Sequence, residues 1–224
     1  MDTQQSRDKI LARIRALQGH APGLRQKELG AAQAYLAYHP EGPQPRIEGD
    51  LIDRFEAQSR KLSASVARLQ RRDLVPAEVA RYLKAEGIAP EAICWPSLIS
   101  LDWSAAGLAV EGRAPVRDTP KPDLVGITGC FAAIAETGTL AMVSGPDTPA
   151  SMTLLPETHI ALVPASRICP YMEDVFVRLR GERGSLPRAL NFISGPSRTA
   201  DIEQTLVLGA HGPYRVHVII LENE

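Results

Sequence analysis

The 224-residue sequence has few cysteines. Cys94, Cys130 and Cys169 are odd in number and far apart, so they predict neither a disulfide framework nor a Cys-x-x-Cys metal or redox motif. An iron–sulfur cluster is usually held by about four thiolates, which this chain cannot supply by itself. We therefore expect no cofactor to be bound by this chain alone. We also expect Cys94 and Cys169 to be small buried side chains.

The sequence also lacks the features of several other classes of protein. No apolar stretch approaches the roughly 20 residues of a membrane span, and the N-terminal MDTQQSRDKILARIRAL has no apolar signal region, so we expect a cytoplasmic protein. The 25 basic residues balance the 26 acidic ones without any long basic run, which argues against a nucleic-acid partner. No dinucleotide-binding, P-loop, nucleophile-elbow, zinc-protease or EF-hand pattern occurs, and no metal site is predicted.

The N-terminal part of the chain is mainly helical in pattern. Residues 8–17 place apolar side chains at helical spacing, and residues 40–49 form a linker rich in proline, glycine and charge. Helical periodicity returns over 51–69, and Pro76 stands in a favourable first-turn position for another helix. We expect residues 1–85 to form a helical extension of the same domain as the rest of the chain.

The remainder of the chain alternates short apolar runs with turns or helical segments, a pattern typical of a sheet covered by helices. The 44% hydrophobic content is sufficient for one sizeable core. We therefore expect an α/β core over residues 86–224. The strands are predicted at 92–95, 124–127, 132–135, 140–143, 160–163, 190–193 and 216–221.

The first informative segment runs from Val125 to Leu140. Glycines after its apolar strand allow a tight turn, and Glu136-Thr137-Gly138-Thr139 between two apolar runs predicts a hairpin tip. Such a tip presents one carboxylate and two hydroxyls at a strand end, where binding residues often gather. Turn chemistry alone also explains every glycine, with Glu136 simply solvated.

The second segment follows the strand that ends at Ile193. Gly195, a proline and Ser197 precede a stretch compatible with a helix, which Ser197 or Thr199 could cap. The N–H groups of such a helix N-terminus favour an anion. Because Asp201 and the glutamate two residues later already satisfy the helix dipole, capping without a ligand explains the pattern equally well.

Three histidines complete the candidates. His211 lies between glycines ahead of the last strand, where it could act as acid, base or ligand, or be a hydrogen-bonded structural group. His217 alternates with valines, and we expect it on a strand surface. His159 opens the strand 160–163; it could face the same site as Glu136 and His211, or merely end a helix.

These segments together resemble the LUD-domain (lactate-utilization) family. Residues 134–140 are similar to its A-E-T-G-T motif, and 154–163 to its L-P-x-x-H-I-x-x-V motif. Residues 195–203 are similar to G-P-S-x-T-A-D-I-E, and 209–213 to G-x-H-G-P. Order and spacing agree over 123–221, and the lack of an appended cysteine array is similar to the LutC branch rather than the LutB branch.

The resemblance implies a fold like the NagB/RpiA/CoA-transferase group, with a mostly parallel central sheet flanked by helices. It also implies a part in oxidising L-lactate to pyruvate alongside LutA- and LutB-like subunits that carry the iron–sulfur clusters. This chain would then be a non-redox component that binds a small carboxylate or a partner. The alternative is a stand-alone transferase, isomerase or ligase acting on acyl-CoA, sugar phosphate or folate substrates, with Glu136 as nucleophile or base.

The candidate site has two groups of residues. Glu136 and His211 are the candidate catalytic residues. The candidate ligand-binding residues are Thr128, Thr137, Gly138, Thr139, His159, Gly195, Ser197, Thr199 and Asp201.

Overall fold

The computed structural model describes residues 4–18, 24–39, 41–116, 124–200, 206–209 and 211–224. The chain forms two compact units, Met1–Pro45 and Arg46–Glu224. The first unit holds helices α1 (Gln4–Leu17) and α2 (Leu24–Tyr38), and α1 has no buried residue. The helix predicted at 8–17 is confirmed. Helix α2 lies within residues 1–85, predicted to be a helical extension, although its own bounds were not predicted.

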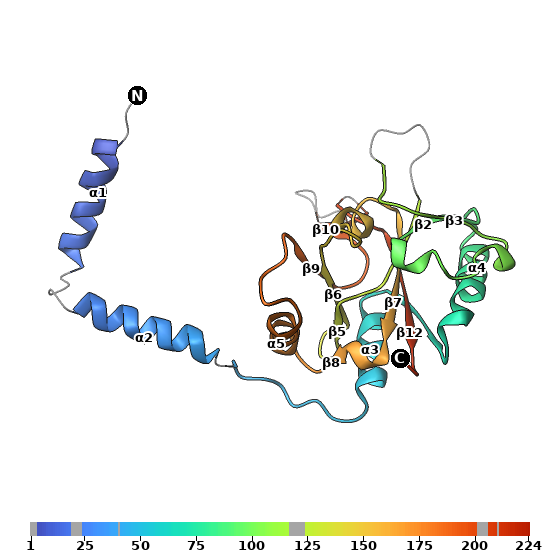
Figure 1. The fold of residues 1–224 in the computed structure, drawn as a ribbon, viewed down its shortest axis with the longest axis horizontal. Coiled ribbons are helices and arrows are strands. Elements are labelled where there is room, and N and C mark those ends of the chain that lie inside the picture. The colour runs from blue at the N-terminus through green and yellow to red at the C-terminus, as the bar shows by residue number, and fades with distance from the viewer. Residues whose placement is uncertain (1–3, 19–23, 40, 117–123, 201–205, 210) are drawn as a thin grey trace. The chain divides into compact units, whose positions relative to one another are not determined.

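The second unit is built on a six-stranded, fully parallel sheet (Figure 1). Its middle strand β7 is buried from Thr158 to Val163, as expected of a parallel strand covered on both faces. Helix α4 (Val75–Ala85) lies on one face, where Tyr82 stacks on a histidine of the sheet. In spatial order the strands are β1 (Ser65–Leu69), β12 (Arg215–Leu221), β7 (Thr158–Pro164), β4 (Val125–Thr128), β2 (Glu91–Cys94) and β3 (Ala109–Gly112).

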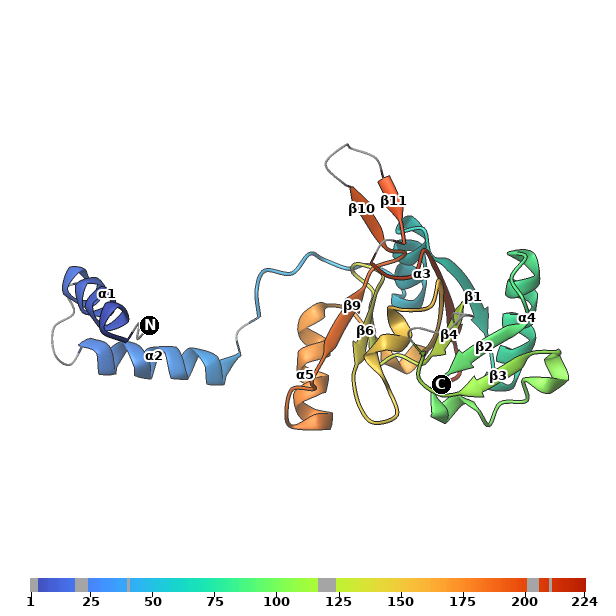
Figure 2. The ribbon, with the colours of Figure 1, turned by 90° about the horizontal axis from the view of Figure 1, so that it is seen from above.

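A second, four-stranded mixed sheet covers the other face of the parallel sheet. Its strands are, in order, β8 (Ile168–Cys169), β5 (Ala132–Ile134), β6 (Thr139–Val143) and β9 (Leu190–Ile193). Side chains such as Leu140 and Met142 share one buried cluster with the parallel sheet. The opposite face packs on α5 (Met172–Arg183) through Val175 and Leu179, with α4 and α5 on opposite sides of the unit (Figures 1 and 2).

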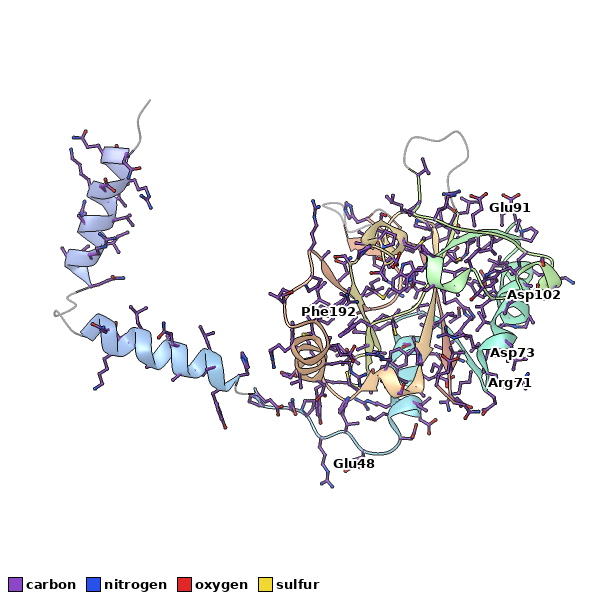
Figure 3. The ribbon with its side chains drawn as sticks, in the orientation of Figure 1. Glu48, Arg71, Asp73, Glu91, Asp102 and Phe192 are labelled. Carbon is purple, nitrogen blue, oxygen red and sulfur yellow. The ribbon has the colours of Figure 1, made fainter. Side chains whose placement is uncertain are left out.

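An aromatic contact also joins α5 to the mixed sheet. The ring of Phe192 on β9 lies 6.0 Å from that of Phe176 on α5 (Figure 3). Short helical turns join the main elements: η1 (Arg72–Leu74), η2 (Pro96–Leu98), η3 (Ser104–Ala106), η4 (Ala150–Thr153) and η5 (Ala165–Arg167). Within the described ranges, no helix is both long and apolar enough to cross a bilayer.

One predicted helix is wrong over its second half. Helix α3 spans Leu51–Lys61, with the Asp50 carboxylate accepting the N–H groups of Ile52 and Asp53 at its start. The chain then turns through Ser63, whose φ is +67°, and continues as β1 beside β12. The apolar residues beyond position 61 have helical spacing, but this segment forms a strand because it pairs with β12, a part of the chain far away in the sequence.

The other strand predictions and the fold class are confirmed: the unit is a parallel sheet flanked by helices. Because α3, β1 and α4 belong to the second unit, its contacts begin at Arg46, whereas the sequence placed the core boundary after residue 85. The helical stretch predicted after Ser197 is wrong. Strand β10 (Arg198–Ala200) stands there instead and pairs with β11 (Leu206–Leu208).

Candidate functional site

The predicted hairpin tip is confirmed. Strands β5 and β6 pair antiparallel, with Ile134 opposite Thr139, and the turn between them holds Glu136 and Gly138. The Gly138 N–H donates to the Ile134 carbonyl at 2.9 Å. Gly138 has φ +68°, and a Cβ there would lie 2.4 Å from the backbone nitrogen of Ser59. Both the conformation and the close approach therefore require glycine.

A second glycine approaches the same helix end from another direction. Gly195 follows strand β9 with φ +76°, and a Cβ there would lie 2.4 Å from the Leu62 carbonyl oxygen. Leu62 is the C-cap of α3, one residue past its last helical position. The hairpin tip and the Gly195 segment therefore both rest on the last turn of α3.

A chain of three hydroxyls links these two segments. Thr137 Oγ1 lies 2.7 Å from Thr139 Oγ1, which lies 2.7 Å from Ser194 Oγ. Each hydroxyl carries one hydrogen, so two bonds among three hydroxyls leave one O–H to donate elsewhere. Thr137 and Ser194 are exposed while Thr139 is buried, so both ends of the hydroxyl chain reach the surface.

The glycine-flanked loop that contains His211 joins the same place. Ser197 donates its N–H to the Pro213 carbonyl at 2.8 Å and accepts the Gly209 N–H at 3.0 Å. His211 is exposed in an irregular connection ahead of β12, as predicted. We call the exposed or half-buried side chains of Thr137, Ser194, Ser197 and His211 the motif surface. The first two belong to segments that rest on the last turn of α3, and the last two to segments joined by the backbone bonds of Ser197.

One predicted ligand residue near this surface, Thr199, has a different setting from the one expected. Thr199 lies in strand β10, not at a helix N-terminus, so the anion site based on a helix dipole is not formed there. Asp201 lies outside the described residues. Glu136 is half-buried at the hairpin turn, and its N–H donates to the Pro170 carbonyl at 3.1 Å.

The structure places Thr128 and His159 in the interior. Both are fully buried, and Thr128 Oγ1 lies 2.8 Å from His159 Nε2 across neighbouring strands β4 and β7. His159 Nδ1 has no hydrogen-bond partner within the described part of the chain. Burial lowers the pKa of His159 to about 4, because an imidazolium there would lose its hydration. The ring is therefore neutral at pH 7.

His217 is not a surface residue, contrary to the sequence prediction. It is buried under α4, where its ring stacks on Tyr82 with centroids 4.1 Å apart. Its Nδ1 lies 2.8 Å from Ser65 Oγ, and its Nε2 lies 3.3 Å from a Glu78 oxygen without an aligned hydrogen bond. Burial outweighs this carboxylate and lowers the pKa of His217 to about 4. The stacking contact with Tyr82 favours a His217 side chain that points into the interior.

The cysteines are placed as expected of structural thiols. Cys94 and Cys169 are buried, as predicted, and Cys130 is half-buried. Burial raises the pKa of Cys94 and Cys169 to about 11 and that of Cys130 to about 12. Among the residues that the structure describes, no three His, Cys, Asp or Glu side chains are grouped to hold a metal ion.

Sequence reasoning missed the last turn of α3. It continued that helix to residue 69, so Leu62 and Ser63 had no expected role. It also passed over Arg198, whose guanidinium donates to the Ser63 hydroxyl. The one available signal was the serine at position 63, where the helical pattern gives way to a strand-like alternation of side chains.

Comparison with curated proteins finds relatives named Lactate utilization protein C. Lactate utilization protein C of Halalkalibacterium halodurans is 42% identical over 118 residues, covering 50% of this chain and 50% of that protein. The Bacillus subtilis protein of that name is 35% identical over 136 residues, covering 57% and 56%. The chain thus spans about half the length of these relatives. The Geobacillus thermodenitrificans protein is 29% identical over 238 residues, covering 98% and 97%.

A solved structure and a family model also match this chain. The crystal structure of a DUF162 family protein from Deinococcus radiodurans superposes with a TM-score of 0.55 at 22% identity, covering 80% of this chain and 100% of that one. That likeness establishes the shared fold. The model of the LUD domain matches residues 52–221, which include every motif of the site. The chain therefore belongs to the LUD-domain family.

Proposed function

We propose that this chain is a cytoplasmic component of an L-lactate utilization system, and that it has no redox centre of its own. The observation that carries the proposal is the joining of three motif segments. Gly138 and Gly195 both contact the last turn of α3, and Ser197 bonds the loop that contains His211. Relatives named Lactate utilization protein C support the lactate assignment. The electrons from L-lactate oxidation to pyruvate would pass through iron–sulfur clusters in LutA- and LutB-like partners.

Within such a system, the motif surface suits a small carboxylate. Its hydroxyl chain ends in exposed Thr137 and Ser194, which can donate to or accept from a hydroxy acid. His211 adds an exposed imidazole, whose ring nitrogens can donate or accept a hydrogen bond. Raised thiol pKa values argue against a cysteine nucleophile as the working group.

Anaerobic affinity purification of the tagged full chain from cells grown on L-lactate tests this proposal. We expect iron and acid-labile sulfide to be retained with the chain, together with partner polypeptides that hold them. A purified chain that retains no iron, from a strain whose growth on lactate does not need the gene, would contradict the proposal.

Glu136 supports a second candidate function. Within the described part of the chain, its half-buried carboxylate forms no hydrogen bond or ion pair, so it is available to react. In a stand-alone acyl transfer, the carboxylate would attack a thioester carbonyl, release the CoA thiolate and form a mixed anhydride. Incubation with acetyl-CoA followed by borohydride would trap that anhydride in the wild type but not in Glu136→Gln. Absence of an adduct in the wild type removes this candidate.

A further inference from the structure

Arg198 differs from most arginines of the second unit. It is exposed at the start of β10, directly after Ser197, and its guanidinium donates to the Ser63 hydroxyl. Within the described ranges, no carboxylate pairs with it. By contrast, carboxylates pair with Arg60, Arg68, Arg71, Arg72, Arg81, Arg113, Arg167 and Arg215. Among the described residues, Arg198 therefore brings to the motif surface a positive charge that no carboxylate pairs.

The partner of Arg198 is held in an unusual backbone conformation. Ser63 has φ +67°, a region that residues other than glycine, asparagine and aspartate rarely occupy. Its conformation is fixed on both sides, because its N–H donates to the Arg60 carbonyl and the preceding Leu62 carbonyl lies under Gly195. Together with the Ala64 N–H, which donates to the Ser59 carbonyl at 3.0 Å, the Ser63 N–H bond closes α3 as a Schellman cap, whose C′ residue is left-handed. The cap fixes the position of Ser63, whose hydroxyl accepts from the guanidinium.

A purely structural role for Arg198 would be to complement the negative end of the α3 dipole. The carbonyls of that end already have donors: Gln58 and Ser59 accept the Leu62 N–H, and Arg60 accepts the Ser63 N–H. Arg198 instead bonds a side-chain hydroxyl. A guanidinium has five N–H donors in a flat fork that matches a carboxylate, and this contact leaves most of them free.

We propose that Arg198 is the group that binds the carboxylate of a small carboxylate ligand at the motif surface. The Ser63 hydroxyl holds the guanidinium in place until the ligand arrives. An exposed end hydroxyl of the Thr137–Thr139–Ser194 chain then contacts the neighbouring hydroxyl or carbonyl of the ligand. This inference rests on the proposed function, for which it names the group that recognises the ligand.

Isothermal titration of the full chain with L-lactate and with pyruvate tests the proposal, with lactamide as the uncharged analogue and inorganic phosphate as a competing anion. We expect one or both carboxylates to bind and lactamide not to bind. Arg198→Ala should weaken carboxylate binding by about 10- to 100-fold, the usual consequence of losing a charged hydrogen bond. Arg198→Lys should recover only part of the affinity, because an ammonium cannot form the forked contact.

Two further variants separate recognition from a structural role. Arg180→Ala removes another exposed arginine, on α5, and should leave binding unchanged. Ser63→Gly keeps the positive φ of this position and removes the hydroxyl that holds the guanidinium in place, so binding should weaken, though by less than in Arg198→Ala. The melting temperature of Arg198→Ala should stay within a few degrees of the wild type.

Several outcomes overturn the inference. They are wild-type affinity in Arg198→Ala, no carboxylate binding by the wild type, and binding of phosphate alone. Growth on lactate separates this inference from the proposed function. If Arg198→Ala binds normally while growth still depends on the gene, only the inference fails. If carboxylate binding depends on Arg198 while growth does not depend on the gene, only the proposed function fails.

Discussion

Gly138 and Gly195 pack against the same last turn of α3, although they come from different strands of the mixed sheet. A Cβ at either position would lie 2.4 Å from a backbone atom, Ser59 N in one case and Leu62 O in the other. Backbone atoms of a helix end cannot move aside as a flexible side chain can. The two glycines therefore set the distance between the motif segments and the helix.

Gly138→Ala should destabilise the chain by about 2–4 kcal/mol, because it combines a positive φ with a backbone clash. Urea unfolding followed by circular dichroism measures this. Gly181→Ala is the matched control: Gly181 lies within α5 with nothing near a Cβ, so alanine should stabilise the protein by up to about 1 kcal/mol. Equal stabilities of the two variants would contradict the packing described for the hairpin tip.

Thr139→Val should cost about 1–3 kcal/mol of folding free energy. Valine keeps the shape of the buried side chain but removes the middle hydroxyl, which leaves Thr137 and Ser194 without their shared partner. Thr137→Val changes an exposed end of the chain and should cost under about 0.5 kcal/mol. Thermal unfolding of both variants compares them, and a larger loss for Thr137→Val would refute the order of the chain.

Acid should unfold the protein partly through His159 and His217. Both have a folded-state pKa of about 4, below the ordinary 6.5, so the unfolded chain binds protons more readily. Their full contribution to stability is present above pH 6.5 and is lost as the pH falls from 6.5 toward 4. In that window each should remove about 1.4 kcal/mol per pH unit at most.

Urea unfolding at several values between pH 7.5 and pH 4.5 checks this slope. His159→Gln should make the slope shallower, whatever its effect on stability at pH 7.5. An unchanged slope in His159→Gln would show that this histidine does not titrate as its burial requires.

The thiols should react slowly in the folded protein. Burial raises the pKa of Cys94 and Cys169 to about 11, so little thiolate is present near neutral pH. We expect a disulfide reagent at pH 8 to modify these two cysteines far more slowly in the folded chain than in urea. Rapid modification of both without denaturant would show that the two buried clusters open readily.

Much of the fold could be predicted because its strands are short apolar runs bounded by turn residues. Residues 160–163 illustrate this, since a parallel strand buried on both faces needs apolar side chains throughout. The end of α3 could not be predicted, because whether 62–69 is helix or strand depends on pairing with β12 at the far end of the sequence. The inward position of His217 depends in the same way on Tyr82 of α4.

The candidate site was predicted in part. Turn chemistry identified the tip around Gly138 and the exposed loop at His211, both of which are local features of the chain. The pairing of His159 with Thr128 is a contact between neighbouring strands, and it places both side chains in the interior. Likewise Arg198 has no local signal, because its partner Ser63 belongs to a distant segment.

Growth on L-lactate as sole carbon source tests the central claim most directly. The strain lacking this gene should not grow on L-lactate but should grow normally on glucose, and the wild-type gene or Gly181→Ala should restore growth on lactate. Normal growth of the deletion strain on L-lactate, with no related gene expressed, would contradict the assignment of this chain to lactate utilization.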